Sequence, residues 1–391
     1  MVSPVLTNDV FSKIEVVPDL PAKKSSPEIS KLNENKKRYF QSALNAVRTQ
    51  VYPKSMMVAK KGIDISIDII TLTSGLSRMC LAVTKAVSSF FLSSQFVQNM
   101  VNVLKPIFAY LNLAQIVLAP LHLYNIFHSV YDLIKGEIDI KDCLLNALKS
   151  IGLLVCSITT LIRDLAYIGA IPLKFIKNLW PLDIFGIIVS GLTLISSARQ
   201  WHDSAKFSKE FRAIFDSNKD ISQFCEDDYI KMRDFILKQD TKRLKRITDI
   251  RGQEIIERIT RICDQALHKD IEGASKEDRD KAKKDFCEAM NALQGRVKTS
   301  ITSSKVSVAV ASTKLVASTV LFTSTIVSLA CPVTLAATPI LMGTSYAAIG
   351  IAEGVGLGNF VHDFVKNKKF MSSNLMKLDL KTQVKEPDVK P

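Results

Sequence analysis

Between Lys314 and Glu353 the chain runs for 38 residues, Leu315 to Ala352, without one charged side chain. A water-exposed helix of this composition would leave far more apolar surface in solvent than soluble helices do, and removing such surface from water is the main favourable term in folding. The segment must therefore be covered, either by a lipid bilayer or by a large helical core. No other feature of the sequence constrains the fold as strongly.

Two prolines divide this neutral segment into a candidate hairpin. Leu315–Cys331 is the first arm, Pro332 to Pro339 bounds a turn, and the second arm begins at Ile340. The 17 residues of the first arm would span about 25 Å as a helix, against a bilayer core of about 30 Å. The sequence is compatible with a paired hairpin that crosses a thinned bilayer or with a shallow re-entrant loop.

The second arm carries small residues at mostly four-residue intervals. They are Gly343, Ala347, Gly350, Gly354 and Gly358. Small residues let two helix backbones approach closely in lipid, and Ser and Thr side chains of the first arm can hydrogen-bond across such a contact. We therefore predict that these are helix-packing residues, with the first arm as their partner. Glu353 lies within this face, and we interpret it as the point where the helix leaves the lipid.

The first half of the chain, residues 62–200, is also apolar. Its uncharged runs are Ala86–Leu104, Pro106–Tyr131, Ser150–Ile162 and Ile184–Ala198. The last two are shorter than the roughly 17–25 residues of a transmembrane helix, and Pro120 interrupts the second. Two interpretations stay open, a bundle of mutually buried helices or a set of spans with polar faces turned inward; we favour at least one span. We expect Pro106, Pro172 and Pro181 to start or break helices.

Residues 201–300 differ in kind, because they hold 22 basic and 20 acidic side chains. Their apolar residues form two stripes at helical spacing, one with Ile255, Ile259, Ile262 and Ala266 and one with Ala282, Phe286, Met290, Leu293 and Val297. Ser275 and Asp278 have the spacing of a capping box before the second stripe. These patterns predict amphipathic helices in water, either a spacer or an arm that binds a protein partner.

The two ends of the chain are polar, and the formal net charge is +14. Met1 to Leu20 lacks a basic region followed by an apolar one, so we expect no cleavable signal peptide. Basic residues concentrate beside the apolar regions, near Lys36 and Lys366, which predicts that both termini lie on the same, cytosolic side of a membrane. The expected organisation is a disordered leader (1–35), an apolar helical region (36–200), a charged soluble helical region (201–300), a hydrophobic helical hairpin (301–365) and a basic disordered tail (366–391).

No pattern in the sequence points to catalysis, a cofactor or a metal. The five histidines form no H-E-x-x-H motif, the seven cysteines form no C-x-x-C pair, and Gly354-x-Gly356-x-Gly358 lacks the spacing and preceding strand of a dinucleotide loop. We therefore expect no catalytic residue, no cofactor, no metal site and no enzymatic activity. The basic residues are scattered rather than arranged in an aromatic-studded stripe, so nucleic acid is not an expected partner.

The layout resembles that of chlamydial inclusion-membrane proteins and similar injected effectors of intracellular bacteria. The resemblance rests on the Ser- and Pro-containing leader, the paired apolar segments Leu315–Cys331 and Ile340–Phe360, and the charged helical segments outside them. It implies a hairpin inserted in a host vacuole membrane and secretion into a host cell. This chain differs in placing the hairpin near its C-terminus and in carrying a second apolar half.

Together these patterns predict an all-α fold of long apolar helices with a charged amphipathic helical arm and a C-terminal hydrophobic hairpin. The first hypothesis for function is a membrane-associated interaction protein whose partners are a lipid bilayer and another protein, with self-association into a homo-oligomer open. The alternative is a pore former whose apolar segments stay sequestered until they insert. An enzyme with an unrecognised helical site is the third.

Overall fold

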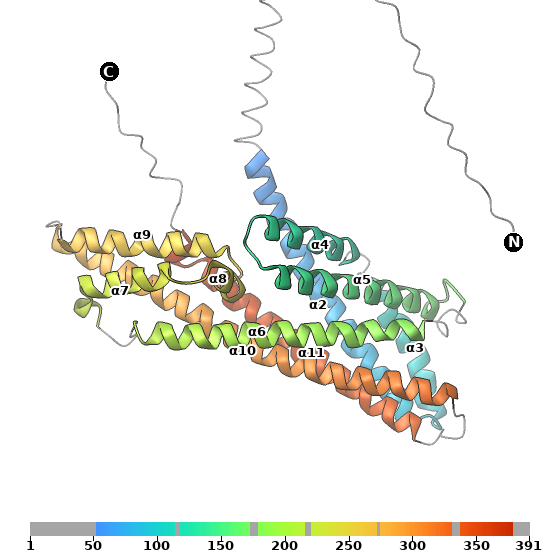
Figure 1. Ribbon diagram of the computed structural model, residues 1–391. Helices are drawn as coiled ribbons and strands as arrows, with labels where there is room; N and C mark the ends of the chain where they lie inside the picture. The colour runs from blue at the N-terminus through green and yellow to red at the C-terminus, as the bar shows by residue number, and fades with distance from the viewer. Residues whose placement is uncertain are drawn as a thin grey trace, which may run out of the picture. The chain divides into compact units, whose positions relative to one another are not determined.

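The computed structural model describes residues 52–113, 118–172, 179–215, 220–271, 274–330 and 337–377. The chain divides into two compact units, Met1–Ser66 and Ile67–Pro391, and all contacts described below lie within the second. Every described element is a helix and none is a strand, so the all-α prediction is confirmed (Figure 1). The expected leader, residues 1–35, lies outside the described residues.

The apolar half of the chain forms long helices. They are α2 (Tyr52–Phe90), α3 (Gln95–Asn112), α4 (Leu118–Ile134), α5 (Ile140–Tyr167) and α6 (Ile184–Arg212). Pro181 lies in the short 3-10 helix η4 (Trp180–Asp183) that leads into α6, and Pro172 follows the end of α5, as predicted. Pro106 lies inside α3, so the prediction for that proline was wrong. A proline removes one helical hydrogen bond, and here the buried Val101 and Ala109 hold α3 on either side of it.

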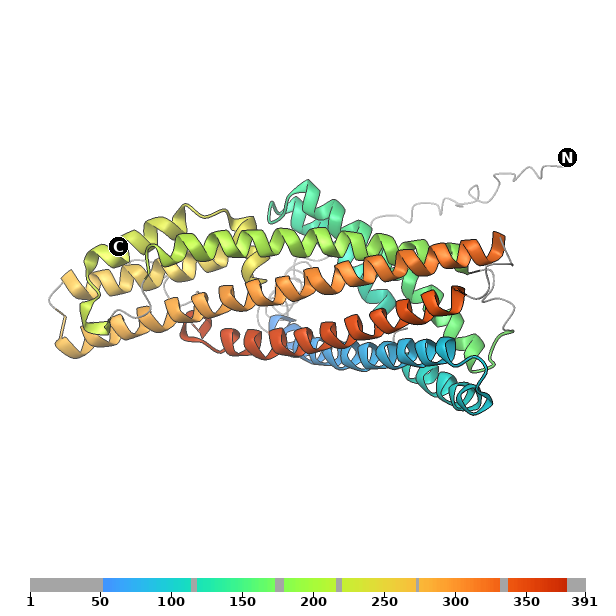
Figure 2. The same ribbon diagram turned by 90° about the horizontal axis from the view of Figure 1, so that it is seen from below.

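The charged region continues with further helices. They are η5 (Ile221–Gln223), α7 (Glu226–Leu237), α8 (Thr241–Thr248), α9 (Gly252–Ile271), α10 (Lys276–Ala330), α11 (Thr338–Met371) and α12 (Asn374–Lys377). α10 runs without a break through 55 residues, and α6 and α11 lie alongside it (Figure 2). Helices therefore pass through positions 200 and 300, where the sequence suggested boundaries between regions.

One group of helices encloses a dense apolar core, which we call the head core. α7, α8, α9 and α12 pack there with the C-terminal part of α6 and the N-terminal part of α10, and we call this assembly the head. The ring of Phe286 contacts those of Phe215, Phe224 and Tyr229 at centroid distances of 6.2, 5.6 and 4.9 Å. Every residue of the two predicted stripes is buried here, so both stripes are confirmed.

The predicted cap at the start of α10 is also confirmed. The backbone N–H of Asp278 donates to Oγ of Ser275 at 3.2 Å, and that hydroxyl donates to the Asp278 carboxylate at 2.8 Å. The cap satisfies one of the amide groups that a helix N-terminus leaves without an intrahelical partner.

The first part of the expected disordered tail, residues 366–391, is ordered. α11 extends to Met371 and α12 follows, while residues 378–391 lie outside the described residues. The reason is apolar anchoring, because Phe370 and Leu375 are buried in the head core. Nη1 of Arg258 also donates to the carbonyl oxygen of Met376 at 2.9 Å. Two isolated apolar side chains in a basic segment were too weak a signal to predict this.

Two native cysteines of the head provide a test of its packing. Cys225 is exposed at the start of α7, whereas Cys263 of α9 is 1% exposed, and burial raises the pKa of its thiol to about 12. Because the thiolate is the reactive form, at pH 8 we expect a maleimide to modify Cys225 rapidly and Cys263 only on unfolding. Residue-resolved mass spectrometry of the labelled chain across a urea series measures this. Equal rates for both thiols in the absence of urea would contradict the head core.

Candidate functional site

Four helices of the described chain are long and apolar enough to cross a bilayer. The candidate segments are Ile140–Tyr167, Pro181–Arg212, Lys276–Ser328 and Thr338–Met371. Only 11% to 22% of the residues in their most apolar windows are buried by the rest of the protein. Ile351 is 68% exposed, Val316 64% and Ile195 57%. Apolar surface of this extent marks contact with a membrane or a partner, and the four helices are compatible with a membrane-associated helical protein.

Two of these helices come from runs that were expected to be too short. Ser150–Ile162 and Ile184–Ala198 contain no charge, but α5 extends beyond the first run on both sides, and α6 extends beyond the second at its C-terminal end. The expectation was wrong because helix length, rather than the charge-free run, decides whether a segment can span, and a long lysine side chain can reach toward the interface. The two longer runs, Ala86–Leu104 and Pro106–Tyr131, are instead divided between α2, α3 and α4.

The two charges that bound the neutral segment form an ion pair with each other. Nζ of Lys314 on α10 lies 2.8 Å from Oε1 of Glu353 on α11, and the two side chains are 27% and 14% exposed. Arg78 of α2 lies near enough to act on the same carboxylate electrostatically. The pair closes the base of the neutral hairpin, so Glu353 is tied to α10, a role beyond that of the exit point expected from the sequence. The expected turn, Pro332 to Pro339, lies largely outside the described residues.

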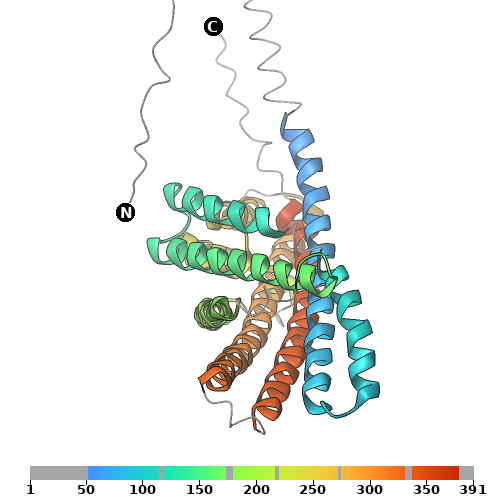
Figure 3. The ribbon, with the colours of Figure 1, turned by 90° about the vertical axis from the view of Figure 1, so that its right-hand side faces the viewer.

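Three residues of the predicted small-residue face lie against a different helix from the one expected, although α10 also packs on α11. A Cβ added at Gly343, Gly350 or Gly354 would approach side chains of α2 to between 3.0 and 3.2 Å. The side chains concerned are Phe90, Val83 and Met79. Figure 3 shows α2, in blue, running beside α11, in red. The absence of a side chain at these glycines is what lets α2 approach so closely.

No such close approach to α2 is seen at Gly358, another member of the face, and the hydroxyl groups expected to contact the face bond elsewhere. Ala347 is half-buried, and a Cβ at Gly358 would meet nothing within 4 Å. Thr319 and Thr325 of α10 donate to carbonyl oxygens of their own helix, at 2.8 and 2.9 Å, rather than to α11. A carbonyl four residues back is always within reach of a helical threonine, which explains this preference. That the five small residues hold helices together in lipid stays a prediction.

A row of polar contacts joins the apolar helices at the level where they meet the head. It links α5 to α6 through Asp142 and Arg199, α6 to α10 through Trp201 and Lys305, and α10 to α11 through Ser303 and Asn359. Nζ of Lys305 lies 5.5 Å from the centre of the Trp201 ring. Nδ2 of Asn359 donates to the carbonyl oxygen of Ser303 at 3.1 Å. We call this the head-side row.

A second polar contact joins α5 and α6 at their other ends. Nη2 of Arg163 lies 2.7 Å from Oδ1 of Asp183, just before α6 begins. Nearby, Nδ2 of Asn112 donates to the buried carboxylate of Asp164 at 2.7 Å. The apolar parts of α5 and α6 are thus bounded by charges at both ends.

Helix α8 connects the head to the apolar helices through charge, and we call these contacts the α8 junction. Arg246 reaches two helices, with Nη1 at 2.8 Å from Asp142 of α5 and Nε at 2.7 Å from Asp203 of α6. Nζ of Lys245 lies 2.7 Å from Asp132 of α4 and 2.9 Å from Glu137. Desolvation alone would lower the pKa of Lys245, but its hydrogen bonds to these two carboxylates outweigh desolvation and raise it.

Two further pairs extend the junction. Nη1 of Arg243 lies 3.0 Å from Glu210, and Lys242 forms an ion pair with Asp139, the residue before α5. The hydrogen bond from Lys242 holds the pKa of Asp139 below its usual value. Four basic residues of the two-turn helix α8 therefore bind carboxylates of α4, α5, α6 and the α4–α5 turn.

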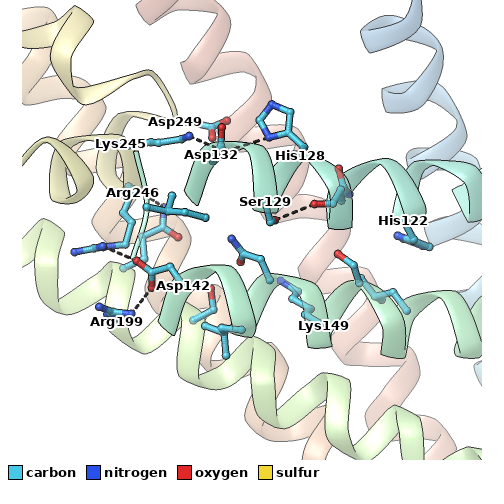
Figure 4. A pocket seen from close by; sticks show the side chains of 18 of the residues that line it. His122, His128, Ser129, Asp132, Asp142, Lys149, Arg199, Lys245, Arg246 and Asp249 are labelled. Carbon is cyan, nitrogen blue, oxygen red and sulfur yellow. Dashed lines mark hydrogen bonds and ion pairs between the residues drawn. The ribbon is translucent and has the colours of Figure 1, made fainter. Parts of the chain in front are cut away.

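A cavity of about 660 Å³ opens beside the α8 junction. Figure 4 shows that α4 and α5 line it on facing sides, with the carboxylates and basic residues of the junction at one end and His122 toward the other. Lys149 of α5 points into it. No sequence motif marked these residues, because their polar side chains are spread over two helices and become neighbours only in the fold.

The described residues contain no group of three or more His, Cys, Asp or Glu side chains placed to hold a metal ion. The six cysteines within the described ranges are free thiols. Comparison of the chain with protein-family models, with curated proteins and with solved structures finds no match.

The Lys314–Glu353 pair predicts a specific pattern of coupling. Lys314→Met or Glu353→Gln alone leaves one charge unpaired among apolar helices and should lower stability by on the order of 3 kcal/mol. The double variant should lose less than the sum of the two, because both single variants remove the same interaction. Thermal unfolding of the full chain in detergent micelles measures the cycle. Additive losses would show that the two side chains do not interact.

The α8 junction predicts that Arg246 matters more than a surface arginine. Arg246→Met removes two ion pairs whose side chains are at most 21% exposed and should lower the melting temperature by on the order of 5 °C. The control is Arg233→Met in α7, whose pair with Asp264 is more exposed and should contribute little. The same micelle assay compares them, and equal small shifts would argue against the junction.

Proposed function

We propose that this protein is anchored in a bilayer by α5, α6 and the α10–α11 hairpin, with the head standing in water on one side. The observation that carries the proposal is the spacing between the polar contacts. Along α5, Asp142 and Arg163 are 21 residues apart, and along α6, Asp183 and Arg199 are 16 apart. These separations correspond to about 31 and 24 Å of helix, close to the hydrocarbon thickness of a bilayer.

The two helices of the hairpin fit the same hydrocarbon layer, which we call the slab. From Thr338 to Asn359, α11 rises about 31 Å, and from Lys305 to Ala330, α10 rises about 37 Å. The Lys314–Glu353 pair then lies within the slab, where mutual pairing reduces the cost of two ionised groups. Trp201 beside Lys305 places an aromatic ring and a lysine at the head-side surface, where both residue types favour membrane interfaces.

In this arrangement the number of crossings is even, so the head and the end of α11 share one side. Basic side chains gather there, in α8 and in Lys366, Lys368 and Lys369 at the end of α11. Lysine and arginine resist translocation, which favours the cytosolic side for the head.

The head is then the part of the protein offered to a protein partner, and its role is that of an interaction module. Its 201–300 segment has a charged surface over a packed core, which is compatible with recognition by charge complementarity. The resemblance to inclusion-membrane proteins points to a host vacuole membrane as the first location to test. Immunofluorescence of an epitope-tagged chain, produced by an intracellular bacterium, checks this; signal confined to the bacterium would remove the location but leave the anchoring.

Cysteine accessibility tests the anchoring directly. In a chain whose native cysteines are replaced by serine, single cysteines at Val316, Ile351 and Ile151 probe the slab, and one at Leu237 probes the head. These side chains are 64%, 68%, 43% and 54% exposed in the protein alone, so in water all four should react similarly. On intact vesicles we expect a membrane-impermeant maleimide to label Leu237→Cys and to leave the other three unlabelled until detergent is added.

Two results would count against anchoring. One is labelling of Val316→Cys and Ile351→Cys on intact vesicles at the rate of Leu237→Cys. The other is release of the wild-type chain from membranes by alkaline carbonate. Leakage of dye from the same vesicles on addition of soluble protein would instead favour the pore-forming alternative.

A further inference from the structure

The cavity between α4 and α5 is lined by two polar stripes. His122, Asn125 and Ser129 lie on one face of α4 at spacings of three and four residues. Asp142, Asn146 and Lys149 lie on one face of α5 at spacings of four and three. Helical periodicity puts the members of each stripe on one face, and Figure 4 shows the two helices facing each other across the cavity. A polar groove therefore runs between two helices whose other faces are apolar.

Most of the charges at the head end of this groove are already paired, and Asp249 is the exception. Asp132 is held by Lys245 and by His128, whose Nδ1 lies 3.1 Å away. Asp142 is held by Arg199 and Arg246. Farther along, Arg296 pairs with Asp363 at 2.9 Å. Asp249, which also lines the cavity, is exposed to solvent at the C-cap of α8.

Lys149 is different, because no described residue forms an ion pair or hydrogen bond with its ammonium group. The other end of the groove also holds an unsatisfied group, since Nδ1 of His122 is buried without a hydrogen-bond partner among the described residues. Arg78, which does not itself line the cavity, lies near enough to His122 to act on it electrostatically. An unpaired ammonium group in a partly desolvated site costs free energy that an anion would recover.

The position of the groove limits what that anion can be. Lys149 follows Asp142 by seven residues, about 10 Å along α5, so on the proposed function it lies in the head-side third of the bilayer. The outer faces of the two helices expose large apolar side chains, among them Phe127 (72%), Ile134 (78%) and Leu144 (58%). A molecule with acyl chains along these faces would present its headgroup to the groove.

We infer that the α4–α5 groove is a binding site for a phosphate group, carried by an anionic lipid, with Lys149 as its main electrostatic contact. The Lys149 ammonium, the His122 imidazole and the amides of Asn125 and Asn146 supply donors for the phosphate oxygens. Charge-assisted contacts of this kind are the strongest hydrogen bonds available to a headgroup. The inference rests on the proposed membrane anchoring for the position of the site, but its chemistry can be tested without a bilayer.

The test is native mass spectrometry of the full chain in maltoside micelles, titrated with dioctanoyl phosphatidic acid. Dioctanoylglycerol has the same chains without phosphate, and inorganic phosphate is added as a competitor without chains. We expect one phosphatidic acid to bind, dioctanoylglycerol not to bind, and Lys149→Met to raise the Kd about tenfold. The control is Lys141→Met, an exposed lysine of the same helix outside the groove, which should leave the Kd unchanged.

Each remaining outcome decides the inference. Displacement of the lipid by millimolar inorganic phosphate, lost in Lys149→Met, supports the phosphate site and identifies the free anion as a ligand too. Equal binding of dioctanoylglycerol, or unchanged binding in Lys149→Met, overturns it. Lys149→Arg, which keeps the charge, should retain binding, and melting temperatures without lipid show whether each variant folds. Because micelles replace the bilayer, loss of binding here and failure of the vesicle labelling are separate results.

Discussion

The attraction between the basic residues of α8 and the carboxylates of the apolar helices fixes α4 and α5 against the head, into which α6 and α10 run directly. The head has its own apolar core, but the apolar helices expose their side chains and cannot be organised by burial against the head alone. Arg246 and Lys245 supply the missing specificity, because each reaches two carboxylates from different segments at 2.7 to 2.9 Å. Removing Arg246 would leave the carboxylate of Asp203 without an ion pair among the described residues, so the interaction favours one register of α5 and α6 against the head.

Local periodicity was enough to predict much of the fold. The stripes through Ile259 and Phe286, the cap at Ser275 and the all-α class all follow from patterns within one helix. The neutral segment after Lys314 predicted a hairpin for a similar reason, because its length and its two prolines leave few ways to fold it. Such features depend on sequence neighbours, which a single chain displays directly.

The contacts between distant segments could not be predicted this way. Nothing in the sequence showed that α2 would lie against Gly343, Gly350 and Gly354. Small residues predict a close contact between helices but do not indicate which helix makes it. The same holds for the candidate groove, since the stripe of His122 on α4 and that of Lys149 on α5 look like polar interruptions until the helices pair. Counting only charge-free residues also hid α5 and α6 as possible spans, because Lys149 and Arg199 were taken as ends.

The unbroken course of α10 has a mechanical consequence. A helix of 55 residues is about 82 Å long, and α10 has no proline at which it could hinge. Its first turns are built into the head core, and its last turns reach the far end of the neutral hairpin. A tilt or rotation of the head would therefore move the far end of α10 as well, because the unbroken helix does not bend between them.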